Sequence, residues 1–195
     1  MIQINNISKR YGDVIVFENY SLALPKGHTY AIMGQSGKGK TTLLHMLMGL
    51  IQPDQGEITG VPLLQLSAVF QENRLCDTLD CYTNILLPHL HKKSALTMNR
   101  TVIQNALDAV GLPDCLHRPI STLSGGMKRR VAIVRALLAE YQVLLMDEPF
   151  KGLDEQTKAQ TMAYVKESTV GKTVLFITHD DYEVDIMHPS RTIYM

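Results

Sequence analysis

The sequence predicts an α/β fold: a core with a mostly parallel sheet, an N-terminal antiparallel β unit and an inserted helical unit. Two segments, 143–146 and 173–178, are apolar almost without interruption, and a helical pattern separates them. Such strands are typical of a parallel sheet that helices cover on both faces. The chain has 195 residues, which is the length of one domain. We therefore expect residues 1–195 to form a single domain.

The antiparallel β unit is expected within the first thirty residues. Ile2 to Ile7 alternates between apolar and polar residues, segment 14–17 follows the turn signal Gly12-Asp13, and segment 20–24 stops at Pro25. Alternation with period two, broken by turn residues, predicts an antiparallel sheet of short strands.

A strand, a loop and a helix follow one another in the next part of the chain. Segment 29–33 has the composition of a strand, and apolar residues at helical spacing run from Thr41 to Leu50. Residues 53–56 mark a turn, and 67–70 is expected to be a short buried strand.

Residues from 75 to about 120 are expected to form the helical unit inserted between the two parts of the core. Helical spacing is clearest from Thr101 to Leu112. The core then resumes with predicted helices at 126–139 and near 155–168, which flank the first of the buried strands.

Composition excludes several classes of function. The chain has 19 Lys and Arg and 19 Asp and Glu, so its formal net charge is zero; this argues against a nucleic-acid binder that relies on positive charge. Cys76, Cys81 and Cys115 lack the spacing of a disulfide framework or a zinc site, which indicates a reducing compartment. No run of about 20 apolar residues could span a bilayer, so any membrane crossing is expected of another chain.

The strongest local signal is a glycine-rich loop between the predicted strand 29–33 and the helix after it. It reads, in order, Gly34, Gln35, Ser36, Gly37, Lys38, Gly39, Lys40, Thr41 and Thr42. This pattern is a P-loop, in which backbone N–H groups and the helix N-terminus bind phosphates. It predicts a P-loop NTPase core, with Lys40 on the β- and γ-phosphates and Thr41 on Mg²⁺. A glycine-rich loop that only turns the chain is the alternative.

An acidic pair ends the predicted strand 143–146. Asp147 lies where a buried parallel strand emerges at its carboxyl end, which is where ligands bind in open α/β sheets, and we expect it to hold Mg²⁺ through water. Glu148 is expected to orient and deprotonate the water that attacks the γ-phosphate. On its own, an Asp-Glu pair after a strand is more often a solvated turn.

A second glycine-flanked helix start lies at Ser124, Gly125 and Gly126. Such a terminus is suited to an anion. Because the P-loop already holds the triphosphate from one side, we infer that these residues face the γ-phosphate of a nucleotide held by another copy of the domain. The alternative is an ordinary N-cap with a flexible lead-in.

Taken in order, these motifs resemble the ATP-binding subunit of an ABC transporter. The resemblance rests on the P-loop, on Gln71 after a short strand, on segments 123–126 and 143–148, and on His179 after the last strand. It extends over nearly the whole chain. It implies a Mg²⁺-dependent ATPase that works as a head-to-tail dimer, either of identical chains or with a paralogous ATPase, with each ATP between the P-loop of one copy and the Ser124 loop of the other.

The resemblance also implies roles for residues outside the P-loop. Tyr11 is similar to the aromatic residue that stacks on adenine, and Gln71 to the glutamine that touches Mg²⁺ or the attacking water. His179 is similar to the switch histidine that contacts the γ-phosphate, and segment 152–154 to the loop between the two subunits. The plainer alternatives are a strand-end tyrosine, a surface glutamine and a satisfied polar histidine.

Import is the expected direction of transport, because Met127 and Phe150 resemble residues of importer ATPases of the nitrate, sulfonate and taurine type. The resemblance implies membrane-spanning permease subunits as partners, an extracytoplasmic solute-binding protein, no nucleic acid, and a peripheral place at the cytoplasmic face of the membrane. The alternatives are an ATPase of an export or lipoprotein-release system and a soluble ABC-type regulator. A nucleotide-gated docking subunit without turnover and a P-loop kinase are weaker alternatives.

Overall fold

The computed structural model describes residues 1–90 and 99–195. Its main sheet has five parallel strands, in the order β5 (Leu66–Val69), β6 (Val143–Asp147), β7 (Thr173–Ile177), β3 (Thr29–Met33) and β8 (Arg191–Tyr194). A second sheet is antiparallel, in the order β2 (Val14–Leu24), β1 (Ile2–Tyr11) and β4 (Gln55–Thr59). This is the α/β architecture that the sequence predicts.

The antiparallel sheet differs from the prediction of short strands, which is wrong for this part of the chain. Segments 14–17 and 20–24 belong to one strand, β2, because an irregularity in the ladder absorbs the break between them. Asn19 lies there with a φ of 50°, and its N–H donates to the Ser8 hydroxyl. Asn tolerates this left-handed conformation better than most residues, so a turn-like residue interrupts the pattern without ending the strand.

Helices pack on both faces of the parallel sheet. One face packs against α1 (Lys40–Leu47) and the antiparallel sheet, and the other packs against α4 (Gly125–Leu138), α5 (Glu155–Ser168) and α6 (Asp181–Met187). In β6, Val143 and Leu145 point to the first core, whereas Leu144 and Met146 point to the second. Strands buried on both faces read as continuous apolar runs, which is why they were predicted.

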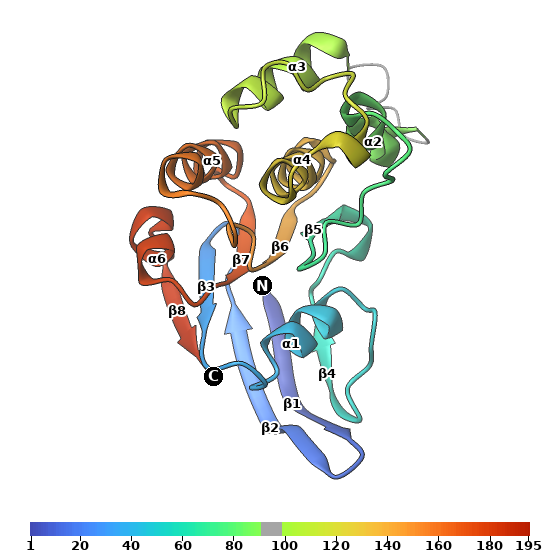
Figure 1. The fold of residues 1–195 in the computed structure, drawn as a ribbon. Coiled ribbons are helices and arrows are strands. Elements are labelled where there is room, and N and C mark those ends of the chain that lie inside the picture. The colour runs from blue at the N-terminus through green and yellow to red at the C-terminus, as the bar shows by residue number, and fades with distance from the viewer. Residues whose placement is uncertain (91–98) are drawn as a thin grey trace.

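A third apolar core holds the helical segments together. It is formed by α2 (Cys81–Leu86), α3 (Arg100–Ala109) and the loop to η4 (Ile120–Thr122), and it packs on Val131 and Val134 of α4. Helix α4 therefore belongs to two cores at once. Figure 1 shows α2 and α3 at one end of the molecule and the antiparallel sheet at the other. Residues 91–98, which fall within the predicted helical unit, lie outside the described residues.

The last part of the chain contains two elements that the sequence analysis did not assign. Asp180 is the N-cap of helix α6, and its side chain accepts a hydrogen bond from the Tyr182 N–H. Strand β8 then joins the edge of the parallel sheet beside β3. Of the four residues in β8, only Ile193 is buried, so the strand carries almost no apolar signal. Within the described ranges, no helix combines the length and the apolar character that crossing a membrane requires.

Candidate active site

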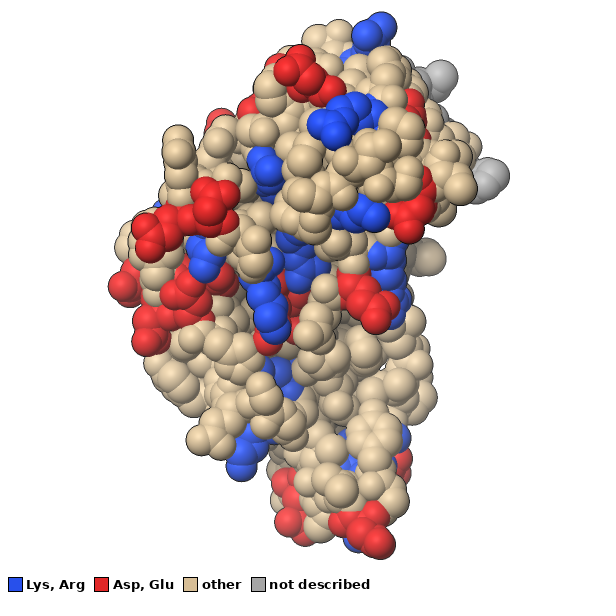
Figure 2. All heavy atoms as spheres, viewed as in Figure 1, with Lys and Arg blue, Asp and Glu red and all other residues tan. Residues whose placement is uncertain are grey.

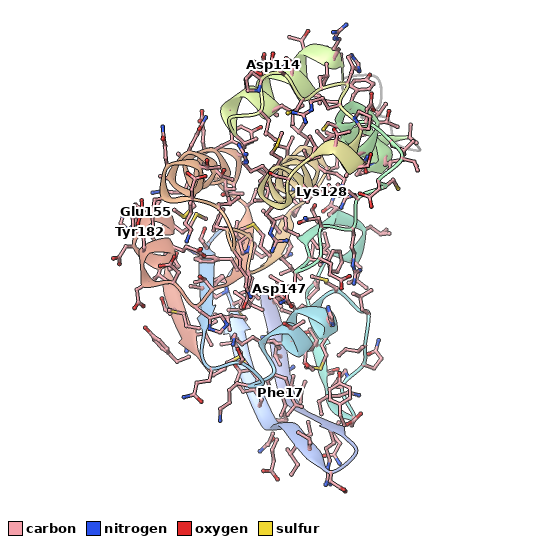
Figure 3. All side chains as sticks on the ribbon, in the orientation of Figure 1. Phe17, Asp114, Lys128, Asp147, Glu155 and Tyr182 are labelled. Atoms are coloured by element: carbon pink, nitrogen blue, oxygen red, sulfur yellow. The ribbon has the colours of Figure 1, made fainter. Side chains whose placement is uncertain are left out.

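The topology of the parallel sheet brings the predicted motifs together at one edge. Asp147 at the end of β6 is in register with Ile177 of β7, which in turn is in register with Ile32 of β3. The P-loop follows β3, Gln71 follows β5, and His179 follows β7. Figure 3 shows Asp147 at this edge, near α1 in the middle of the molecule. The carboxyl ends of parallel strands are where ligands bind in such sheets.

A cavity of about 330 Å³ opens at this edge. Most of its lining residues are predicted site residues: Tyr11, Ser36, Gly37, Gly39, Lys40, Thr41, Thr42, Gln71, Asp147, Glu148 and His179. Val16 and Ile177 complete the lining, and the sequence analysis missed them because a single apolar strand residue carries no signal for a site. The other predicted residues, Gly34, Gln35, Lys38 and Ser124 to Gly126, do not line the cavity.

The P-loop has the backbone that a phosphate cradle requires. Gly39 has a φ of 90° and precedes the first residue of α1. A Cβ at this position would lie 2.4 Å from Cγ1 of Val16, so only glycine fits. The first turn of α1 contains no acidic residue, which leaves the partial positive charge of the helix N-terminus free for an anion.

Lys40 is buried, and its side chain reaches back to the first two residues of the loop. Its ammonium group donates hydrogen bonds to the carbonyl oxygens of Gly34 and Gln35, at 2.7 and 2.8 Å. Burial lowers the pKa of Lys40, while the negative charges of Glu148 and Asp147 act in the opposite direction. Lys38 is exposed and lies off the cavity. The loop thus presents one lysine, Lys40, to the cavity.

A hydroxyl and a carboxylate meet at the start of α1. The Thr41 hydroxyl donates to Oδ2 of Asp147 at 2.8 Å, and Asp147 is buried. Burial raises the pKa of Asp147, and the hydrogen bond from Thr41 opposes that rise. In the described part of the chain, no group of three or more His, Cys, Asp or Glu is arranged to hold a metal. The pair fits Mg²⁺, which binds through one or two carboxylates together with substrate phosphates.

Both carboxylate oxygens of Glu148 have a partner. Oε1 lies 3.0 Å from Nε2 of His179, and Oε2 lies 2.5 Å from Nζ of Lys151. Burial raises the pKa of Glu148, but Lys151 and His179 more than offset this effect, and the pKa is lowered. The side chain is therefore a carboxylate, which is the form that accepts a proton. The sequence analysis missed Lys151, although a cation three residues after the acid was visible.

A partly buried network supports the loop that carries His179. The Thr178 hydroxyl donates to Oε2 of the buried Glu183 at 2.6 Å. Lys158 of α5 forms ion pairs with Asp180 at 2.6 Å and with Glu183 at 3.1 Å. Both neighbours of His179 in the sequence are thus tied to the scaffold, which holds the imidazole beside Glu148.

The Ser124 loop lies apart from this cavity. Ser124 caps α4, and its hydroxyl oxygen accepts a hydrogen bond from the Met127 N–H at 3.3 Å. Ser124 and Gly125 are exposed, and Gly126 faces Leu153. On the face drawn in Figure 2, basic side chains lie along the middle of the molecule, while acidic side chains gather on the side of α5 and α6. The exposed helix start is thus available to an anion that this cavity does not hold.

Comparison with known proteins identifies the family. The sequence profile described as ABC transporter matches residues 17–151, which contain the P-loop, the Ser124 loop and the acidic pair.

The chain belongs to the ABC transporter family.

Relatives within this family are named for different transport systems. The chain is 35% identical to the spermidine/putrescine import ATP-binding protein PotA of Treponema pallidum and 36% identical to the sulfate/thiosulfate import ATP-binding protein CysA of Synechocystis, over 93% of its own length. It spans about half of these two relatives, 51% and 54%. It is also 33% identical to the intermembrane phospholipid transport system ATP-binding protein MlaF of Escherichia coli, over 94% of this chain and 75% of that protein.

Solved structures of ABC cassettes share the fold. A bacterial ABC transporter cassette solved as a dimer aligns over the whole chain with a TM-score of 0.88, at 29% identity, and 94% of that cassette is covered. A dimeric cassette in a post-hydrolysis state with ADP and Pi aligns with a TM-score of 0.85, at 27% identity. The predicted fold and the predicted family of ABC ATPases are confirmed. The likeness to nitrate, sulfonate and taurine importers stays a prediction.

Proposed function

We propose that this ABC cassette hydrolyses Mg²⁺-ATP as one half of a head-to-tail dimer. The observation that carries the proposal is that the predicted site residues lie in two separate places. One cavity gathers the P-loop, Asp147 and Glu148, whereas the Ser124 loop is exposed outside it. A second copy, or a paralogous cassette, would bring its own Ser124 loop over the nucleotide. The likeness to cassettes solved as dimers supports this arrangement.

The chemistry proposed for the cavity is attack of water on the γ-phosphate of ATP. A bond forms between the water oxygen and the γ-phosphorus, the bond from that phosphorus to the oxygen bridging the β- and γ-phosphates breaks, and ADP and phosphate result. Glu148 takes the proton from the water, as its carboxylate form allows. Each of its oxygens has one partner in this structure and can accept a second hydrogen bond, so a water molecule can bind there while His179 and Lys151 stay in place.

Lys40 and a bound Mg²⁺ are the cations proposed to contact the phosphates. Lys40 would exchange the carbonyl oxygens of Gly34 and Gln35 for phosphate oxygens, which carry more negative charge. Thr41 and Asp147 would hold Mg²⁺, which supplies charge neutralisation on the phosphate oxygens. These positions make stabilisation of developing charge the main contribution of the P-loop.

Tyr11 is proposed to bind the base. It lines the cavity and is half exposed, so part of its ring is open to a stacking partner. Such a contact is worth roughly 0.5–1.5 kcal/mol beyond buried area, and it recognises a flat ring without reading its edge.

A membrane-spanning permease is proposed as the partner that uses the energy. A second cavity of about 330 Å³ lies between β5 and α4, and its lining is mostly apolar, with Met48, Leu50, Phe70 and Pro88. Leu50 is 55% exposed. The lining includes residues of β5 and Phe70, which precedes Gln71, so a segment of a permease docked in this cavity would contact the strand that leads into the ATP cavity.

Transport of a solute is the proposed use of this cycle, and import is the proposed direction. Two of the relatives above carry import in their names, and Met127 and Phe150 resemble importer residues. MlaF, which belongs to a phospholipid system, makes lipid transport the second candidate. Purification of the chain from its native membrane distinguishes them: a permease with a solute-binding protein supports import, and a permease with lipid-binding subunits contradicts it.

The proposed dimer is tested by mixing two inactive variants. Lys40→Ala removes the phosphate lysine, and Ser124→Arg blocks the second half of the site. In a head-to-tail pair of the two variants, the intact P-loop of one chain meets the intact Ser124 loop of the other. Random pairing at equal concentrations then restores up to about one quarter of the unaltered activity, since half of the dimers are mixed and each has one complete site.

Each variant alone, at the same total concentration, is the matched control and should show almost no phosphate release. No recovery on mixing would contradict the shared site, provided that both variants melt like the unaltered chain. Full activity of the Ser124→Arg variant alone would contradict it directly.

A further inference from the structure

Helix α4 carries three arginines whose side chains turn inward to carbonyl oxygens. Arg130 donates to the carbonyls of Val110 and Gly111, at the end of α3. Arg135 donates to the carbonyls of Asn73 and Arg74, after Gln71. These two arginines thus fasten α4 to its neighbours.

Arg129 is the buried member of the three, with 4% of its surface exposed. Its Nη1 donates to the carbonyl oxygen of Phe70 and, at 3.3 Å, to Oδ1 of Asn73. Its Nη2 donates to the carbonyl oxygens of Asp147 at 3.1 Å and Glu148 at 2.6 Å. One guanidinium thus connects α4, the segment that contains Gln71, and the end of β6.

The backbone at Glu148 needs such support. Its φ is 45°, a left-handed conformation that costs a non-glycine residue of the order of 1–3 kcal/mol and persists only where the surroundings fix it. The Glu148 N–H donates to the Ile177 carbonyl at 3.1 Å, and its carbonyl accepts from Arg129. The peptide groups on both sides of the Glu148 Cα are therefore fixed, and the carboxylate is aimed at His179.

Arg129 lies close to Ser124 in the sequence. It follows Ser124 by five residues, and both belong to the start of α4. Helix α4 as a whole contributes residues to two apolar cores. A guanidinium remains protonated in proteins, although burial lowers the pKa of Arg129 and the nearby acids oppose this. The guanidinium group is planar and has five N–H donors, so it can hold several carbonyl oxygens in fixed geometry.

We propose that Arg129 is a positioning residue through which the start of α4 and the Gln71 segment set the placement of Glu148. A movement of α4, caused by a nucleotide at Ser124, or of the Gln71 segment, caused by a permease, would be transmitted by the shared guanidinium to the backbone of the proposed base. The inference rests on the proposed function and adds a residue to it. Arg129 does not line the ATP cavity, so it acts through Glu148 and not on the nucleotide.

The test compares Arg129→Gln with Arg135→Gln, its matched control on the same helix. Arg135 also donates two hydrogen bonds to the segment after Gln71, but none to Asp147 or Glu148. Because a misplaced base can cost up to about 100-fold, Arg129→Gln is expected to lower kcat for ATP by about 10- to 100-fold, with KM changed less than about threefold. Arg135→Gln should change both less than about threefold.

Two further measurements separate positioning from a loss of folded protein. Arg129→Lys keeps the charge and at least one donor, so its kcat should lie between those of Arg129→Gln and the unaltered chain. The stoichiometry of bound ATP counts folded sites, and it should stay constant while kcat falls. Equal kcat losses for Arg129→Gln and Arg135→Gln, or a loss that matches the missing ATP sites, would overturn the proposal.

Hydrogen exchange on the unaltered chain gives a test that requires no variant to fold. When a non-hydrolysable ATP analogue is added, amides of residues 71–74 and 148–151 should change their protection together, because one side chain links them. A change in one segment without the other would overturn the inference. Failure of the variant mixing described above would instead contradict the dimer while leaving this link within one chain intact.

Discussion

Replacement of Glu148 by glutamine separates nucleotide binding from hydrolysis. An amide has almost the same shape as the carboxylate and can still meet His179, but it does not accept a proton from water. A general base contributes roughly 10²- to 10⁴-fold, so kcat should fall at least ~100-fold. ATP should still bind, because Lys40 and Thr41 are unchanged.

The cost of Glu148→Gln in stability should be small. The variant loses the ion pair with Lys151, whose side chain is 65% exposed, and exposed pairs contribute at most about 1 kcal/mol. For a domain of this size, the melting temperature should then move by no more than about 2–4 °C. The variant should therefore be inactive while remaining folded.

Phosphate release at saturating ATP measures the loss, and binding of a fluorescent ATP analogue measures affinity. Glu167→Gln, at an exposed position on α5, is the matched control for the chemical change and should behave like the unaltered chain. A kcat for Glu148→Gln within about threefold of the control would refute the assignment of the base, since no such residual rate is expected without one.

Three other substitutions test single contacts. Lys151→Met removes a group that lowers the pKa of Glu148, so the acidic limb of kcat/KM against pH should move to higher pH; an unmoved limb would contradict the ion pair's role. Asp147→Asn keeps the hydrogen bond to Thr41 but loses the charge, so the Mg²⁺ concentration for half-maximal activity should rise at least ~10-fold, and an unchanged Mg²⁺ titration would argue against the metal site. Tyr11→Ala should weaken ATP binding about 2- to 10-fold in equilibrium titrations, whereas Tyr11→Phe should not; equal affinities for both variants would remove the stacking role.

The parts of the fold that could be predicted are those in which local chemistry fixes the pattern. Strands 143–146 and 173–178 are buried on both faces, so their apolar runs are unbroken. The P-loop needs glycine where a side chain would clash, as at Gly39, and needs Lys40 and Thr41 at fixed offsets. Because parallel strands place their carboxyl ends at one edge, the order of these motifs was sufficient to gather most of the cavity.

The parts that could not be predicted depend on contacts between distant segments. Strand β4 is mostly exposed, and the turn predicted at 53–56 is wrong for Gln55 and Gly56, which begin this strand. Its pairing with β1 is a backbone ladder that leaves no apolar period. Lys128, Arg129 and Arg130 are equally basic in the sequence. Only the packing of α4 between two cores decides that Arg129 is buried against Glu148 while Lys128 pairs with Asp77 at the surface.

The dependence of turnover on the concentration of the chain tests the shared site most directly. Phosphate release per subunit is measured at saturating Mg²⁺-ATP over a dilution series, with light scattering at each concentration. The account predicts that turnover per subunit rises with concentration and levels off together with the fraction of dimer. A constant turnover per subunit, at concentrations where scattering finds only monomer, would contradict it.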